Sequence, residues 1–119
     1  MRVLIVDNQL RARQSMRALL NASHQFEEIR EAENGVEAIK LLEEYQPDII
    51  LTDVRMPLMD GIEATKLIKE KWPWIKIIVL SLYPDYQIPA LAAGADGFVS
   101  KSDSPEELRK TLAAVLKKE

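Results

Sequence analysis

The chain has 119 residues, 47% of them apolar and 29% charged, which suits one domain (residues 1–119) with an ordinary hydrophobic core and no second domain. The absence of cysteine excludes disulfides and thiolate metal sites, and it favours a reducing, cytoplasmic setting. The 16 basic and 19 acidic residues give a net charge of −3, which argues against direct nucleic-acid binding by this chain.

The first third of the sequence predicts a buried strand, a helix and a polar strand. Val3–Val6 is an uninterrupted apolar run that ends at Asp7, as expected for a strand covered on both faces. The run is too short for a signal peptide or a membrane span. Residues 9–22 have the spacing of an amphipathic helix. Charged residues interrupt 26–32, so we expect a strand at the edge of the sheet.

The middle of the sequence repeats this pattern of helix and strand. Asn34-Gly35 breaks the chain, and the apolar residues that follow at a spacing of three predict a second helix. The apolar run Ile49–Leu51 then leads to Asp53, and Pro57 forces the chain into a loop. Asp60 is suited to cap the N-terminus of a third helix.

The last third predicts two more strands and two more helices. Ile75–Leu80 is an apolar strand that stops at Ser81, and the prolines that follow allow a short helix over about 89–93. Gly97–Ser100 predicts an edge strand leading to Lys101. Ser104-Pro105 is typical of a helix start, and Lys117 and Lys118 would complement the dipole at the end of that helix.

Alternation of strand and helix predicts an α/β fold with a five-stranded parallel sheet and five helices on its two faces. The more apolar strands belong in the centre, which favours the order 2-1-3-4-5 of the flavodoxin-like, doubly wound arrangement. In that fold the ends of four strands meet at one edge and bring together four polar residues: Asp7, Asp53, Ser81 and Lys101. Neighbouring carboxylates call for a hard cation such as Mg²⁺, and the set as a whole suits phosphoryl transfer.

Three stretches resemble the receiver domain of two-component response regulators, in the order and spacing of that family. They are Val3–Asp7, Asp53–Gly61 and Gly94–Lys101, and the resemblance covers essentially the whole chain. The segment Lys101–Leu108 is similar to the branch whose receivers precede a LuxR/NarL-type helix-turn-helix domain.

The resemblance implies a role for each matching residue. Asp53 would be the phosphoacceptor, Lys101 would contact the phosphoryl group, and Ser81 and Phe98 would be the switch residues. Mg²⁺ would be bound at Asp7, Asn8 and Asp53 and at the main-chain carbonyl of Arg55. The expected partners are a sensor histidine kinase, a second copy of the chain in a homodimer, and DNA only through an output domain absent from these residues. No membrane partner is expected.

One departure from the family leaves an alternative open. The family usually has a second acid where this chain has Asn8, which offers a carbonyl oxygen but no charge, so Mg²⁺ binding should be weaker. A pseudo-receiver, which binds partners without phosphorylation, therefore competes with the phosphorylated switch. We expect no metabolic enzyme, because Arg55 stands where a phosphatase with an aspartate nucleophile has its general acid.

Overall fold

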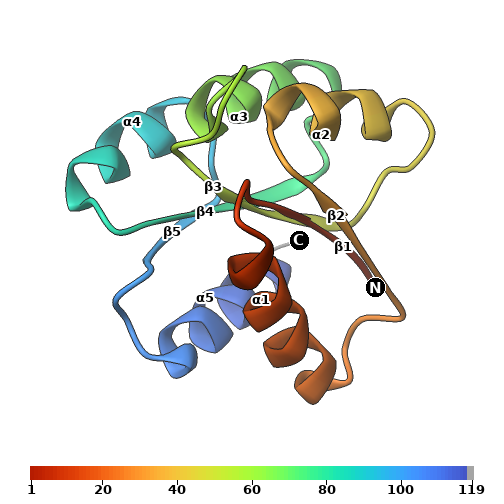
Figure 1. Cartoon of the computed structure of the whole chain (residues 1–119), viewed down its shortest axis with the longest axis vertical. Coiled ribbons are helices and arrows are strands. Elements are labelled where there is room, and N and C mark those ends of the chain that lie inside the picture. The colour runs from red at the N-terminus through yellow and green to blue at the C-terminus, as the bar shows by residue number, and fades with distance from the viewer. Residues whose placement is uncertain (118–119) are drawn as a thin grey trace.

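Five β-strands alternate with helices in the computed structural model, which describes residues 1–117 (Figure 1). The strands are β1 (Arg2–Val6), β2 (Glu28–Ala32), β3 (Ile49–Asp53), β4 (Lys76–Ser81) and β5 (Gly97–Ser100). The helices are α1 (Leu10–Ser23), α2 (Gly35–Leu42), α3 (Gly61–Lys71), α4 (Gln87–Ala92) and α5 (Pro105–Lys117), with a 3₁₀ turn, η1 (Pro84–Tyr86), before α4. Lys118, expected in the last helix, lies outside the described residues.

The strands form one parallel sheet in the order β2-β1-β3-β4-β5, which confirms the predicted topology. The strands that contain an uninterrupted apolar run, β1, β3 and β4, occupy the centre. The polar strand β2 lies at one edge and β5 at the other. Because all five strands run in the same direction, their carboxyl ends lie along one rim of the sheet.

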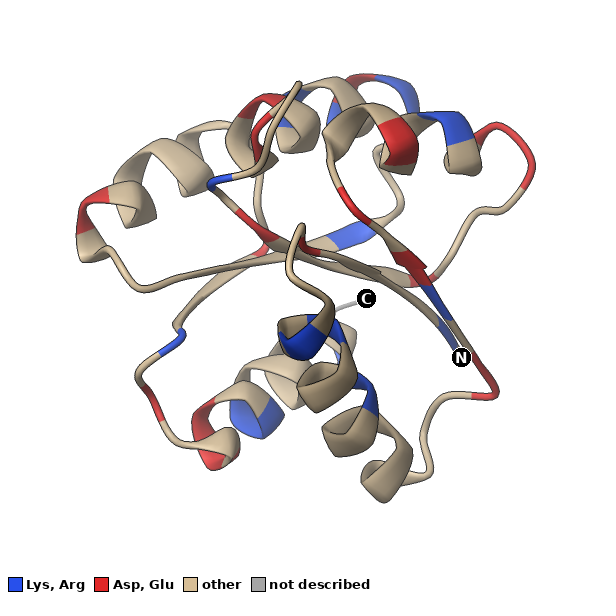
Figure 2. Cartoon of the chain, viewed as in Figure 1, with Lys and Arg blue, Asp and Glu red and all other residues tan. Residues whose placement is uncertain are grey.

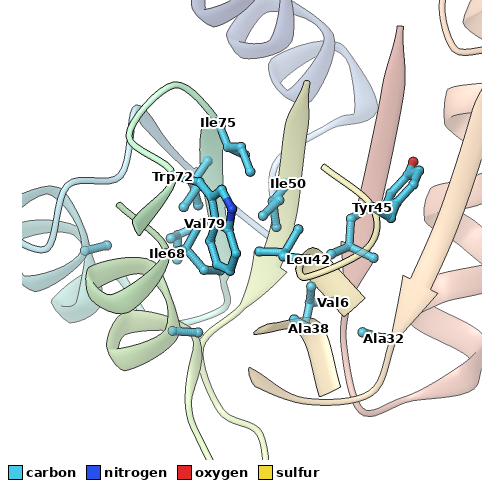
Figure 3. Close-up of a cluster of buried hydrophobic side chains, with 14 of the residues drawn as sticks. Val6, Ala32, Ala38, Leu42, Tyr45, Ile50, Ile68, Trp72, Ile75 and Val79 are labelled. Atoms are coloured by element: carbon cyan, nitrogen blue, oxygen red, sulfur yellow. The ribbon is translucent and has the colours of Figure 1, made fainter. Parts of the chain in front are cut away.

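Each face of the sheet is covered by its own group of helices, so that the strands are buried on both sides (Figure 1). Helices α2, α3 and α4 cover one face, where Leu42, Ile68 and Trp72 pack against strand residues such as Ile50 (Figure 3). Helices α1 and α5 cover the other face, where Leu20 and Leu112 contribute to the core. No helix within residues 1–117 is long and apolar enough to cross a membrane.

The fourth helix differs from its prediction, because it begins earlier than residue 89. Helix α4 starts at Gln87, so Pro89 is its third residue. The first turn of a helix leaves its N–H groups without partners inside the helix, so the missing N–H of proline costs nothing there. Pro84 therefore opens a 3₁₀ turn and Pro89 lies in the first turn of α4, where the sequence predicted a helix that starts only at residue 89.

The connection from β3 to α3 fixes the position of the strand end that carries Asp53. The Asp60 carboxylate accepts hydrogen bonds from the N–H groups of Ile62 and Glu63, which confirms the predicted cap. Gly61 donates its N–H to the carbonyl of Val54 at 2.8 Å. A Cβ atom at Gly61 would lie 1.8 Å from the main-chain oxygen of Asp53, so only glycine allows this close approach.

We predict that Gly61→Ala destabilises the fold, because either α3 or the end of β3 must move to accommodate the methyl group. Overpacking of this kind typically costs about 1–3 kcal/mol of unfolding free energy, measurable by urea denaturation. Lys66→Ala, at an exposed position of the same helix, is the control and should change stability by less than about 0.5 kcal/mol. Equal stabilities for the two variants would contradict the packing argument.

Candidate functional site

The carboxyl rim of the sheet carries the four polar residues expected there. Asp7 directly follows β1, Asp53 ends β3, Ser81 ends β4 and Lys101 directly follows β5. The strand register pairs Asp53 with Leu80 and Ser81 with Ser100, which holds these strand ends level with one another. Residues far apart in the sequence therefore lie along one rim, and three of them, Asp7, Asp53 and Lys101, are in direct contact.

The Lys101 ammonium lies between the two carboxylates. Its Nζ is 2.8 Å from Oδ2 of Asp7 and 3.1 Å from Oδ2 of Asp53. Asp7 is almost fully buried, with 6% of its surface exposed, while Asp53 and Lys101 are partly open to solvent. The cation offsets the repulsion between two neighbouring negative charges, which would be costly at a buried position.

Main-chain groups hold the second oxygen of each carboxylate. Oδ1 of Asp7 accepts a hydrogen bond from the N–H of Gln9 at 2.9 Å. Oδ1 of Asp53 accepts one from the N–H of Val54 at 2.8 Å. Both side chains are thus oriented by their own strand ends, and each directs its other oxygen toward Lys101.

The surroundings of Lys101 keep it positively charged. Partial burial by itself would lower the pKa of its ammonium group, but the hydrogen bond to Asp7 and the charge of Asp53 outweigh that effect. The net result is a pKa above the ordinary value for lysine. The site therefore holds a fixed positive charge next to the Asp53 carboxylate at neutral pH.

The two expected switch residues lie beside this cluster but are not part of it. Ser81 is buried, and its Oγ accepts a hydrogen bond from the N–H of Tyr83 at 3.0 Å. The main-chain carbonyl of Ser81 accepts a hydrogen bond from the N–H of Lys101 at 2.9 Å. This bond joins the end of β4 to the start of the loop that follows β5. Phe98 is partly buried and packs against the core on the α2–α4 face.

The oxygen atoms expected to bind a metal suit a hard cation, although they carry little charge. Two carboxylates, the Asn8 amide and the Arg55 carbonyl are all oxygen donors, as Mg²⁺ prefers. Within residues 1–117, however, no group of three or more His, Cys, Asp or Glu side chains could hold a metal ion. The donor atoms are of the kind that Mg²⁺ prefers, but with Asn8 in place of an acid the set has one negative charge fewer than is usual in the resembled family.

Sequence reasoning missed a network of ion pairs between α1 and β2 that contacts the main chain of Asp7. The amphipathic spacing of residues 9–22 puts the arginines of α1 off its apolar face, yet Arg13 has only 11% of its side chain exposed. Nε of Arg13 and Nε of Arg17 lie 2.8 and 2.7 Å from the two carboxylate oxygens of Glu31, on β2. Nη1 of Arg13 also donates a hydrogen bond to the main-chain carbonyl of Asp7 at 2.7 Å.

This network has a signal in the sequence, which is the spacing of four between Arg13 and Arg17. Residues at that spacing share one face of a helix, and α1 carries basic but no acidic residues opposite the acidic strand β2 (Figure 2). Burial by itself would raise the pKa of Glu31, but the hydrogen bonds and charges of Arg17 and Arg13 outweigh it and lower that pKa. Glu31 therefore stays ionised and orients Arg13.

Comparisons with known proteins agree with the fold and identify the family. Residues 3–113 match the family model described as the response regulator receiver domain. The transcriptional regulatory protein YdfI of Bacillus subtilis is 42% identical over 118 residues, covering 98% of this chain and 55% of that protein. The chain thus spans about half the length of the curated regulators it matches first, with 53% and 55% covered.

Two solved structures are similar over nearly the whole chain. A LuxR-family response regulator from Aurantimonas sp. has a TM-score of 0.91 at 32% identity, with 97% of this chain and 84% of that chain covered. The response regulator TrrA of Thermotoga maritima, in complex with Mg²⁺ and BeF, has a TM-score of 0.87 at 32% identity, with 96% and 97% covered. The chain belongs to the receiver-domain family of two-component response regulators, and its relatives include transcriptional regulators of the LuxR/NarL type.

Proposed function

We propose that this chain is a phosphorylation-dependent switch in which Asp53 accepts a phosphoryl group from a sensor histidine kinase. The observation that carries the proposal is the Lys101 ammonium, 2.8 Å from Asp7 and 3.1 Å from Asp53 at the rim of the sheet. An ionised nucleophile beside a fixed positive charge is what the loose transition state of phosphoryl transfer requires.

The transfer forms one bond and breaks one bond. A carboxylate oxygen of Asp53 attacks the phosphorus of a phosphohistidine, and the bond from phosphorus to the imidazole nitrogen breaks, leaving its electron pair on the ring. Lys101 then exchanges its contact with the Asp53 carboxylate for one with a phosphoryl oxygen. Because the ammonium is already in place, little reorganisation is needed when negative charge develops.

Mg²⁺ is the proposed cofactor, and it would screen the charge between the incoming phosphoryl group and the two aspartates. The residues that would hold it are Asp7, Asn8 and Asp53, together with the main-chain carbonyl of Arg55. Asn8 makes this a weakened position, because an amide oxygen binds a hard cation less strongly than a carboxylate does.

The signal would pass from the rim to the face of the sheet that α2, α3 and α4 cover, through Ser81 and Phe98. The Ser81 hydroxyl, bonded to the N–H of Tyr83 in this structure, would move to donate a hydrogen bond to the phosphoryl group. Phe98, on the neighbouring strand and packed against the α2–α4 face, would follow that movement. The surface around α4 would then change its affinity for partners, which is the output of the switch.

Proposed partners follow from the relatives and their lengths. The matched regulators are about twice as long as this chain and are named transcriptional regulators, so contact with DNA would come through an output domain outside these residues. We also propose that the chain forms a homodimer and is located in the cytoplasm.

Loss of the phosphoryl group by hydrolysis should be slow, because Arg55 offers no general acid or base. The chain is therefore proposed to be a signalling module and not a metabolic enzyme.

The pseudo-receiver is the second candidate function, and Asn8 is the observation that favours it. Such a chain would keep the fold and its partner surfaces and bind no phosphoryl group. The contact of Lys101 with both aspartates weighs against it, because a purely structural module has no need of a partly buried ion cluster at this rim.

The first experiment separates these two functions. Incubation with acetyl phosphate and Mg²⁺ should add one phosphoryl group to the chain, as measured by intact-mass spectrometry. Asp53→Asn should abolish the gain, and Asp85→Asn, which changes an exposed acid of η1, should retain it. No gain with acetyl phosphate or with any histidine kinase would favour the pseudo-receiver.

A second experiment tests the metal position. Asn8→Asp adds a carboxylate next to Asp7, so Mg²⁺ should bind more tightly, by roughly tenfold for one additional charged ligand. The measurement is a Mg²⁺ titration followed by NMR. An affinity equal to that of the wild-type chain would show that residue 8 is not a metal ligand.

A third experiment tests the charge of Lys101 through its pH dependence. Lys101→Met should destabilise the fold at neutral pH by roughly 1–3 kcal/mol, because charge-assisted hydrogen bonds are lost. Since the folded-state pKa is raised, this contribution is complete below the ordinary lysine pKa of about 10.4 and disappears as the pH rises through the folded value. The stability difference between the two proteins should therefore be constant from pH 7 to 9 and shrink at higher pH. A difference that already shrinks below pH 9 would contradict the raised pKa.

A further inference from the structure

Arg55 has a contact that the proposed function does not use. Its Cζ lies 4.9 Å from the centroid of the Tyr83 ring, in a cation–π arrangement that joins the loop after β3 to the loop after β4. The arginine ion pairs within residues 1–117 are formed by Arg2, Arg13, Arg17, Arg30 and Arg109. The Arg55 guanidinium thus has an aromatic face as its partner and no carboxylate among the described residues, and it is exposed to solvent.

Tyr83 connects this contact to the proposed switch. Its N–H donates the hydrogen bond to Oγ of Ser81, at 3.0 Å. Its ring meets Tyr86 edge-on, with 6.1 Å between centroids, and Tyr86 packs against the α2–α4 core. Arg55 therefore rests on the segment that leads from Ser81 into α4.

Charge at the rim calls for a second cation once Asp53 is phosphorylated. A phosphoryl group brings a charge of about −1.5 to −2. Lys101 supplies one positive charge, and the metal position has Asn8 in place of a second acid. Arg55 is two residues from Asp53, so their Cα atoms are at most about 7 Å apart. Its planar guanidinium suits two phosphoryl oxygens at once, which an ammonium cannot match.

We propose that Arg55 is a phosphoryl-binding residue of this site. While Asp53 is a free carboxylate, the guanidinium stacks on Tyr83. When Asp53 carries a phosphoryl group, the guanidinium leaves Tyr83 and donates hydrogen bonds to the phosphoryl oxygens, which supplies positive charge that the metal position with Asn8 holds only weakly. The proposal rests on the proposed function, because it requires a phosphoryl group on Asp53.

The strengths of the two contacts favour this exchange. An exposed cation–π contact changes an equilibrium by roughly two- to fivefold. Charge-assisted hydrogen bonds are worth roughly tenfold or more. The guanidinium therefore gains by moving, and its departure frees Tyr83 at the same time as Ser81 moves. Binding of the phosphoryl group and release of the segment before α4 are then one event.

The test uses beryllium fluoride, which binds an aspartate carboxylate as a stand-in for the phosphoryl group. The chain of residues 1–119 is titrated with BeF₃⁻ at fixed Mg²⁺ and followed by ¹⁹F NMR. Arg55→Gln should weaken BeF₃⁻ binding by about tenfold, and Arg55→Lys should fall between the two because it keeps the charge without the planar fork. Tyr83→Leu should tighten binding by roughly two- to fivefold, because the competing stack is gone.

The matched control is Arg30→Gln. Arg30 also stacks on a tyrosine ring, with its Cζ 4.1 Å from the centroid of Tyr45, but it lies on β2 and away from the rim. This variant should bind BeF₃⁻ as the wild-type chain does. In the wild-type chain, the Arg55 Nε–H resonance should also move when BeF₃⁻ is added.

Two outcomes would overturn the proposal, and they differ in what they imply. If the wild-type chain binds BeF₃⁻ and Arg55→Gln binds it equally well, Arg55 does not contact the phosphoryl group and the proposed function stands. If the wild-type chain neither binds BeF₃⁻ nor gains a phosphoryl group at saturating Mg²⁺, the proposed function fails and the role of Arg55 fails with it.

Discussion

The contact of one ammonium with two carboxylates is the interaction on which the rest of this molecule depends. Lys101 and Asp7 are 94 positions apart in the sequence, so their hydrogen bond exists only when the first and last strands belong to one sheet. A buried Asp7 beside Asp53 would otherwise be two unscreened charges in a site of low dielectric. The parallel direction of the strands and their register bring the compensating cation to that rim.

A second layer of charge extends this arrangement to the edge of the sheet. Glu31, on β2, forms ion pairs with Arg13 and Arg17, and Arg13 also donates a hydrogen bond to the main-chain carbonyl of Asp7. The polar character of β2 therefore has two consequences, because it suits a strand at an edge and also supplies the anchor for α1. These contacts connect the end of β1, where Asp7 follows, to α1 and to the edge strand β2.

The sequence allowed the strand order and the meeting of Asp7, Asp53 and Lys101 to be predicted, because both depend on where apolar runs stop. It did not allow the start of α4 to be predicted, since Pro89 is tolerated at the third position of a helix as well as at the first. The contacts of Arg13 with Glu31 and of Arg55 with Tyr83 were also missed. They depend on the direction of long side chains between elements, which periodicity does not encode.

Asn8 and Arg55 are best understood together, as one change in the charge of the site. With an acid at residue 8 and no arginine, the resting rim would carry excess negative charge and attract a divalent cation before phosphorylation. Here Lys101 contacts both carboxylates and Arg55 stacks on Tyr83, so the attraction for a divalent cation is weak at rest and a phosphoryl group would make the rim more negative. Metal and phosphoryl group should then bind cooperatively, because each is stabilised by the charge of the other. A chain with this balance would respond to its phosphodonor and remain insensitive to Mg²⁺ alone.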